Sequence, residues 1–95
     1  YIAMMKFDWD SRKNSTNKKK HGISFEEALS CFYDPTHILV DDPDHAPEEG
    51  RMILIGLSHL SRLLVVVHAE VHQDDVRIIS ARKATKRERL QYEEV

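Results

Sequence analysis

The feature that most constrains this chain is residues 62–92, RLLVVVHAEVHQDDVRIISARKATKRERLQY. Leu63–Val67 is the most apolar run in the sequence, and a short polar turn separates it from a second apolar segment, Val76–Ala81. Strands joined by so few residues pair antiparallel, because a parallel pair needs a crossover of a dozen or more residues. A basic segment, Arg82–Arg89, follows directly. The stretch therefore predicts a central antiparallel hairpin, with any polar function where the apolar strands end.

The rest of the chain predicts a small α+β fold of the order β-α-α-β-β-β-β-α, with an antiparallel sheet and helices on one face. We expect one domain over residues 5–95. Residues 1–4 precede a plausible start at Met5, and we expect them to be a cloning remnant. The predicted strands are Met5–Trp9, Thr36–Val40, Met52–Leu57, Arg62–Val71 and Val76–Ala81. The predicted helices are Ser11–Lys20, a second one that begins after Ser24 and ends at Asp34–Pro35, and a third from Thr85 through Glu94.

Capping residues set the helix boundaries. Asp10 is a good N-cap for the first helix, and Gly22 is the expected left-handed residue after its end. The pairs Ser24/Glu27 and Thr85/Glu88 have the S/T-x-x-E spacing of a capping box. These signals predict where each helix starts more firmly than the weak helix propensity of Ser11–Lys20 does.

Composition excludes some classes of protein. The single cysteine, Cys31, rules out a disulfide within the chain, and the longest apolar run is far too short to cross a bilayer. The formal net charge is −2, yet the charges are segregated. Lys6–Gly22 carries +4 and residues 82–95 carry +2, whereas Ile23–Gly50 carries −8. Segregated charge of this kind suits an anionic ligand on one face, although solvated surface charge is the simpler explanation.

Hairpin registers predict where polar side chains meet. If Leu57 pairs with Arg62, Arg51 faces His68; if Val71 pairs with Val76, Glu70 faces Arg77 and Val66 faces Ala81. Cross-strand partners point to the same side of a sheet. Arg51, His68, Glu70 and Arg77 should then share the open face, while Leu63, Val65 and other apolar residues hold the helices.

Such a quartet has the chemistry to cleave a phosphodiester. His68 or Glu70 would take the 2′-hydroxyl proton, and the arginines would stabilise charge on the phosphate. The alternative is a plain cross-strand ion pair between Glu70 and Arg77. A metal site at His68, Glu70 and His72 is disfavoured, because the sequence has no H-E-x-x-H and no Cys/His cluster.

Six blocks resemble the BrnT toxin family in their order and spacing. They are F-D-W-D at 7–10, K-H-G-I-S-F-E-E-A at 20–28, D-P-D-H at 42–45, E-G-R-M-I-L-I-G at 49–56, R-L-L-V-V-V-H-A-E at 62–70 and R-I-I-S-A-R-K-A-T-K-R-E-R at 77–89. Ser61 departs from the family, many of whose members have glycine there.

This resemblance implies the toxin of a bacterial type II toxin–antitoxin pair, with a RelE-like fold and RNA cleavage that uses no metal or other cofactor. It favours Arg77 and Arg82 over His68 as catalytic residues, beside Arg51 and Glu70. Lys83, Lys86, Arg87 and Arg89 would hold the RNA backbone. The implied partner is a BrnA-like ribbon-helix-helix antitoxin, in a hetero-oligomer that binds operator DNA in the bacterial cytoplasm.

Two other functions stay open. In the first, the open face and basic segments only dock an antitoxin or another partner, without catalysis. In the second, the chain acts alone as a DNA-binding autoregulator through its basic last helix, although no helix-turn-helix pattern precedes that helix.

Overall fold

The computed structural model describes residues 5–44, 50–72 and 74–94. The expected remnant at residues 1–4 and residues 45–49 of the acidic loop lie outside this range. The elements are β1 (Lys6–Asp8), α1 (Ser11–His21), α2 (Phe25–Ser30), the 3₁₀ turn η2 (Cys31–Tyr33), β2 (Ile38–Asp41), β3 (Arg51–Leu57), β4 (Leu63–His72), β5 (Asp75–Lys83) and α3 (Lys86–Glu93). The predicted α+β class and element order are confirmed.

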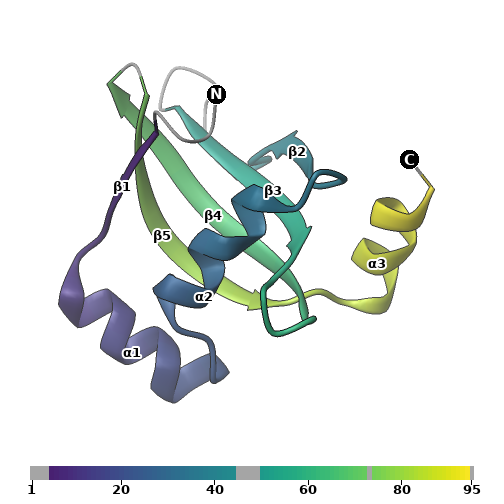
Figure 1. Cartoon of the computed structure of the whole chain (residues 1–95), viewed down its shortest axis with the longest axis horizontal. Coiled ribbons are helices and arrows are strands. Elements are labelled where there is room, and N and C mark those ends of the chain that lie inside the picture. The colour runs from purple at the N-terminus through teal and green to yellow at the C-terminus, as the bar shows by residue number, and fades with distance from the viewer. Residues whose placement is uncertain (1–4, 45–49, 73, 95) are drawn as a thin grey trace.

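The strands form one sheet in the order β1-β5-β4-β3-β2, in which β4 is central (Figure 1). The pairs among β2, β3, β4 and β5 are antiparallel, as their short connections require. Among the strands of the described residues, β1 alone pairs parallel, on the outer edge of β5. Its connection to β5 runs through most of the chain, which leaves ample length for a crossover.

The helix caps follow the sequence signals. Asp10 Oδ1 accepts hydrogen bonds from the amides of Arg12 and Lys13, and Gly22 has the expected left-handed φ of 71°. Thr85 and Glu88 form the complete capping box of α3. At α2 only half of the predicted box exists: Ser24 Oγ accepts from the Glu27 amide, but the Glu27 carboxylate contacts other groups.

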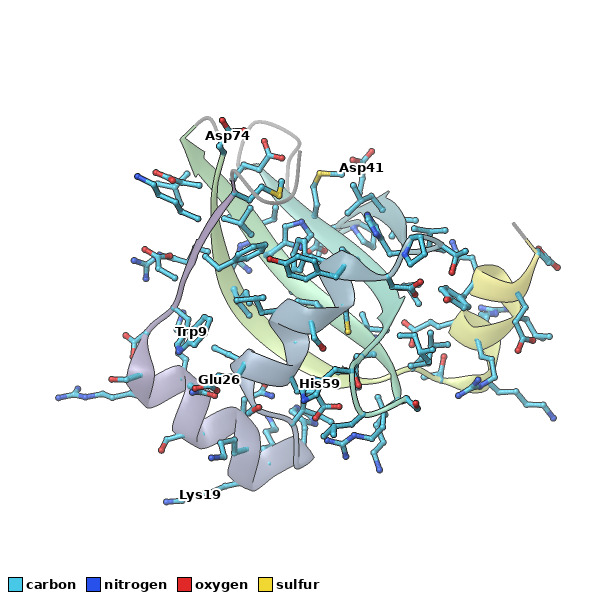
Figure 2. The ribbon with its side chains drawn as sticks, in the orientation of Figure 1. Trp9, Lys19, Glu26, Asp41, His59 and Asp74 are labelled. Carbon is cyan, nitrogen blue, oxygen red and sulfur yellow. The ribbon has the colours of Figure 1, made fainter. Side chains whose placement is uncertain are left out.

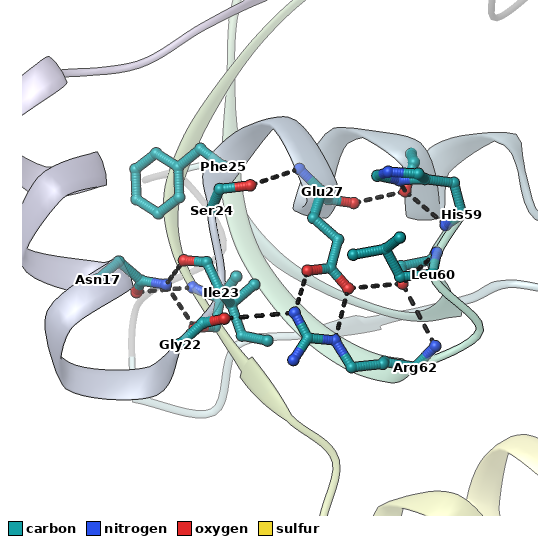
Figure 3. Close-up of polar contacts among 12 residues, drawn as sticks. Asn17, Gly22, Ile23, Ser24, Phe25, Glu27, His59, Leu60 and Arg62 are labelled. Atoms are coloured by element: carbon teal, nitrogen blue, oxygen red, sulfur yellow. Dashed lines mark hydrogen bonds and ion pairs between the residues drawn. The ribbon is translucent and has the colours of Figure 1, made fainter.

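Glu27 instead anchors α2 to the β3–β4 turn (Figure 3). Its carboxylate is 97% buried, accepts a hydrogen bond from Ser58 Oγ at 2.7 Å and forms an ion pair with the guanidinium of Arg62. Arg62 also donates to the Gly22 carbonyl at the end of α1. The hydrogen bond from Arg62 holds the pKa of Glu27 below its ordinary value despite burial. One buried carboxylate therefore ties together two helices and a turn.

Side chains alternate between two packed clusters on opposite sheet faces. Leu54 and Val66 face each other across β3 and β4 and pack under α2, whereas their neighbours Ile55 and Val65 belong to the second cluster. The first cluster also contains Ile23, Phe25, Ala28, Cys31, Phe32, Leu64, Val76, Ile78 and Ala81. Tyr92 of α3 packs against the second cluster, so α3, unlike α1 and α2, does not lie on the predicted helix face.

The free edge of β5 beyond β1 is closed by a side chain. Asn17 of α1 is 94% buried, and its amide accepts from the Ala81 N–H and donates to the Ala81 carbonyl, at 3.1 and 2.8 Å. The side chain thus takes the place of a neighbouring strand and satisfies two backbone groups that would otherwise be buried and unpaired.

Both predicted registers are wrong by one residue at the polar end. Leu57 pairs with Leu63 and Arg51 with Ala69, because Ser61 adopts a left-handed φ of 60° and adds a residue to the turn. Glu70 pairs with Val76, and Arg77 with Ala69. Only the predicted pair Val66–Ala81 is correct. A one-residue slip reverses the faces of a strand, so Leu63 and Val65 lie away from α2.

Candidate nucleic-acid interface

Arg51 and Arg77 occupy one row across the sheet. Both pair with Ala69 of the central strand, from β3 on one side and β5 on the other. Their Cα atoms are therefore about two strand spacings, or about 10 Å, apart. They share the face opposite α2, as predicted for these two residues.

A bulge in β5 adds Arg82 to the same face. Val67 pairs with Ser80 and His68 with Ile78, which leaves Ile79 as an extra residue on β5. Five positions separate Arg77 from Arg82, so in a regular strand they would point to opposite sides. With the bulge, Arg77 faces Ala69 and Arg82 faces Val65, two β4 residues that share a side. We call this side, with Arg51, Arg77 and Arg82, the arginine face.

Arg82 is held by Glu88 at the start of α3. Its two terminal nitrogens donate to the two carboxylate oxygens at 2.7 and 2.8 Å, and the Thr85 amide donates to the same carboxylate at 2.8 Å. The hydrogen bonds from Arg82, with those from Thr85, lower the pKa of Glu88 to about 2 although burial opposes this. The guanidinium is fixed at one end of the arginine face but keeps 43% of its side-chain surface exposed.

Arg77 has a looser partner, which the sequence prediction did not include. Asp8 of β1 pairs with Arg77 in the parallel register, and the two side chains form an exposed ion pair at 3.4 Å. The position of Asp8 depends on β1 adding to the edge of β5, and no local sequence pattern predicts that. The arginine face therefore has a fixed pair, Arg82–Glu88, and a solvent-exposed pair, Arg77–Asp8.

His68 lies on the other side of the sheet, and its predicted place on the open face is wrong. It is 97% buried, with its ring in edge-to-face contact with Phe32 at 4.9 Å between centroids. Burial lowers the pKa of His68, which favours the neutral ring. It lines a cavity of about 190 Å³ with Met5, Phe32, His37, Leu39, Leu54, Glu70 and Val76. A substrate on the arginine face could not reach it.

Glu70 is exposed but also departs from the prediction. By alternation it shares the side of His68 rather than that of Arg77. Near the strand ends it lines a hollow of about 370 Å³ that also contains Arg51, Asp41 and Asp42. The structure thus brings Glu70 near Arg51 at the end of the sheet and separates it from Arg77.

The predicted backbone-binding residues are all exposed: Lys83 ends β5, and Lys86, Arg87 and Arg89 are on α3. No residue of α3 is fully buried, so its position depends on a few contacts. Tyr92 donates a hydrogen bond to Asp34 Oδ2 at 2.7 Å. The Leu57 amide donates to the same oxygen at 2.8 Å. Partial burial alone would raise the pKa of Asp34, but these hydrogen bonds and those from Thr36 lower it to about 2.

The three arginines of this face, with the exposed cations of α3 and Lys83, form a basic surface on a small α+β protein. A surface of this kind suits a polyanionic ligand. Residues 9–88 match the family described as "Ribonuclease toxin, BrnT, of type II toxin-antitoxin system". The chain belongs to this BrnT family of ribonuclease toxins, as the sequence resemblance predicted. Toxins of this class have an RNA substrate and an antitoxin partner.

A solved structure agrees. The 1.1 Å crystal structure of the Brucella abortus ribonuclease toxin, BrnT, is similar to this chain with a TM-score of 0.63 and 26% sequence identity. The match covers 86% of this chain and 99% of the Brucella chain. No curated protein matches this sequence. Within the described ranges, no helix is long and apolar enough to span a membrane.

Proposed function

We propose that this protein is an endoribonuclease that cleaves RNA on the arginine face without a metal ion. The observation that carries the proposal is the bulge at Ile79, because with it Arg77 and Arg82 lie on the same face as Arg51. Cleavage by the 2′-hydroxyl requires cations that stabilise the charge gathering on the phosphate in the transition state. The arginines supply that charge from the chain itself.

In the proposed reaction the 2′-oxygen attacks the adjacent phosphorus and the bond from phosphorus to the 5′-oxygen breaks. The 2′-hydroxyl proton passes to a base, and the departing 5′-oxygen takes a proton from solvent. The products are a 2′,3′-cyclic phosphate and a 5′-hydroxyl. Arg77 and Arg82 bind the non-bridging phosphate oxygens, since guanidinium groups match that geometry with paired hydrogen bonds.

Asp8 replaces His68 and Glu70 as the proposed proton acceptor. His68 is buried on the far side, and Glu70 is directed to that side as well. Asp8 is on the arginine face, and its carboxylate contacts Arg77 at 3.4 Å. A phosphate that binds Arg77 would displace this carboxylate from the guanidinium and leave it next to the 2′-hydroxyl. Glu88 is a poorer base, because Arg82 and Thr85 hold its pKa at about 2.

The first experiment incubates the purified protein with RNA in EDTA and identifies the product ends. We expect cleavage with 2′,3′-cyclic phosphate ends, and its loss in the double variant Arg77→Ala/Arg82→Ala. The matched control is Lys18→Ala/Lys19→Ala, which removes two exposed cations from α1 and should cleave normally. Cleavage that stops in EDTA, or that survives loss of both arginines, would show that this mechanism is wrong.

Lys83, Lys86, Arg87 and Arg89 would hold the RNA backbone beside the scissile phosphate. All four are exposed near Arg82, on the last strand and on α3. Contacts to phosphates add affinity without sequence preference and weaken as salt rises. Replacing Lys86 and Arg87 together should therefore weaken binding of all RNA sequences alike.

In the cell, we propose that RNA cleavage inhibits translation and arrests growth in the bacterial cytoplasm until an antitoxin binds.

The proposed antitoxin is a BrnA-like ribbon-helix-helix protein that forms an operator-binding hetero-oligomer with the toxin. A hollow of about 480 Å³ supports such a partner, since exposed apolar patches mark protein interfaces. Its lining includes the exposed apolar residues Tyr33 and Leu57, with Pro35 and four polar neighbours, Ser30, Asp34, Ser58 and His59. Tyr33→Asp should weaken co-purification of the antitoxin, whereas Lys19→Asp should not; equal retention by both variants would place the antitoxin elsewhere.

A further inference from the structure

A second basic surface lies along α1, outside the residues that the sequence analysis assigned to RNA. A groove of about 280 Å³ runs between α1 and the bulged part of β5. Its lining residues are Arg12, Lys13, Thr16, Asn17, Lys20, His21, Ile79 and Ser80, of which none is acidic. We call it the α1 groove.

The groove side of α1 is fixed by Asn17. Its side chain is anchored to Ala81 of β5, and the groove residues Lys13 and Lys20 lie four positions before and three after it, hence on its side of the helix. Asn14 points elsewhere, because its amide contacts Phe25 and Glu26 of α2. The folded chain therefore directs one set of α1 cations to the groove.

These cations are available to a ligand. Arg12, Lys13 and Lys20 are exposed, and none of the ion pairs found among the described residues involves them. Like charges gathered in this way repel one another unless a counter-charge binds between them. A phosphate backbone in the groove would supply that counter-charge.

The groove continues the arginine face. Ser80, in its wall, pairs with Val67 on the same side of the sheet as Arg77 and Arg82. Ser80 lies between these two arginines along β5. An RNA strand bound at the arginines would therefore need only a few more nucleotides to enter the groove. An open cationic groove that follows a backbone is how sequence-tolerant proteins hold single strands.

We propose that the α1 groove binds the phosphate backbone of the RNA on one side of the cleavage point. This inference rests on the proposed function, because it takes the polyanion at the arginine face to be RNA. Lys13 and Lys20 contribute direct phosphate contacts, and Arg12, which also lines the groove, adds a third positive charge. The substrate thus crosses the sheet from α3 to α1, with the arginine face between the two basic helices.

The test compares two double variants on one helix. Lys13→Gln/Lys20→Gln removes two groove lysines, and Lys18→Gln/Lys19→Gln removes two lysines that do not line it; Figure 2 shows Lys19 extending away from the sheet. The probe is a 2′-O-methyl RNA of about 12 nucleotides, within the range that small single-strand-binding domains cover. It lacks the attacking hydroxyl, so binding is measured without cleavage. The control loses two cations from the last turn of α1, whereas the groove variant loses one from the first turn and one from the last. Since cations stabilise the last turn of a helix, the groove variant should melt no lower than the control.

Each lost phosphate contact lowers the slope of log affinity against log salt by about 0.7 for single strands, so two lost contacts lower it by about 1.4. If the two proteins bind equally at about 1 M salt, the groove variant should bind about 25-fold more weakly than wild type at about 0.1 M salt. The slope itself should fall by about 1.4 in the groove variant and by much less in the control. Equal weakening of both variants would overturn the proposal, since it would show only diffuse attraction. Unchanged RNA binding together with weaker binding of a polyglutamate peptide would overturn it in favour of an acidic protein segment.

Failure of the groove can be separated from failure of the proposed function. If the wild-type protein binds the methylated RNA through the groove but cleaves no unmodified RNA, the groove is correct and the nuclease proposal is wrong. If the wild-type protein cleaves RNA and both lysine variants bind the methylated RNA equally well, the nuclease proposal stands and the groove proposal is wrong. Absence of any RNA binding would overturn both.

Discussion

Neutralising Glu88 should weaken both the fold and the proposed catalysis, because this carboxylate positions Arg82. Glu88→Gln is a mild change: glutamine can still accept from the Thr85 amide and keep the capping box, and can still accept one hydrogen bond from Arg82. What is lost is the negative charge and the second of the paired hydrogen bonds, at 2.7 and 2.8 Å. The variant therefore isolates the ion pair from the helix cap.

The pKa sets the size of the effect. Hydrogen bonds from Arg82 and Thr85 lower the pKa of Glu88 from its ordinary 4.5 to about 2, which gives an upper limit of about 3.4 kcal/mol at about 1.36 kcal/mol per pH unit. Because the Arg82 side chain is 43% exposed, solvent screens the pair, and we expect about 1–2 kcal/mol at pH 7. A lowered carboxyl pKa stabilises the folded state above the unfolded pKa. The difference between wild type and variant should thus be constant above about pH 5 and vanish as pH falls from 4.5 to 2.

Urea unfolding at several pH values measures this difference, with Glu93→Gln on the same helix as the control. Cleavage provides the second measurement: kcat should fall about tenfold, or about 1.4 kcal/mol, with a smaller change in KM, since a misplaced Arg82 loses mainly transition-state contacts. If Glu88→Gln unfolds and cleaves like Glu93→Gln, Glu88 does not position Arg82.

Three further changes test other parts of the structure. Asn17→Leu leaves the Ala81 N–H and carbonyl unpaired at a buried edge and should cost about 2–5 kcal/mol in urea unfolding, whereas Ser15→Leu on the same helix should cost far less; equal effects would mean that Asn17 does not close the sheet. His68→Phe should cleave RNA within about threefold of wild type and should abolish the loss of stability below pH 6.5 that a buried neutral histidine causes; a hundredfold loss of cleavage would return His68 to the active site. Asp34→Asn should loosen α3, with faster amide exchange there and about 1 kcal/mol lower stability, and this difference should disappear as pH falls from 3.8 to about 2; unchanged exchange would contradict the role of the contact between Asp34 and Tyr92.

Local signals in the sequence predict most of the fold. Capping depends on residues within one helical turn, so Asp10, Gly22 and Thr85 predict their helix ends correctly. Short connections require antiparallel pairing, and this too is confirmed. Contacts between distant residues were not predictable in this way. Nothing near Glu27 in sequence shows that its carboxylate binds Arg62, 35 positions away, rather than completing its capping box.

The registers failed because each depended on one backbone conformation. The left-handed residue in the β3–β4 turn is Ser61. Glycine is the usual residue for that conformation, so the sequence signal for this longer turn was weak here. The bulge at Ile79 has no such signal, because isoleucine is an ordinary strand residue. Each feature adds one residue and so moves the pairing by one position.

The two register errors are related, and this explains why Arg51 and Arg77 share a face as predicted while His68 lies on the other one. Arg51 was expected opposite His68 and lies opposite Ala69; Arg77 was expected opposite Glu70 and also lies opposite Ala69. The pairing of β3 with β4 and the pairing of β5 with β4 are each shifted by one position. The side chains of β3 and β5 therefore keep the same faces relative to each other, and only those of β4 change face. The relation between β3 and β5 therefore survives an error in β4, whereas every assignment on β4 itself changes side. The agreement between Arg51 and Arg77 therefore depends on both registers being out by one position, because a slip in only one of them would put the two arginines on opposite faces. In this chain both registers slip, so Arg51 and Arg77 share the arginine face, whereas His68 and Glu70 point away from it.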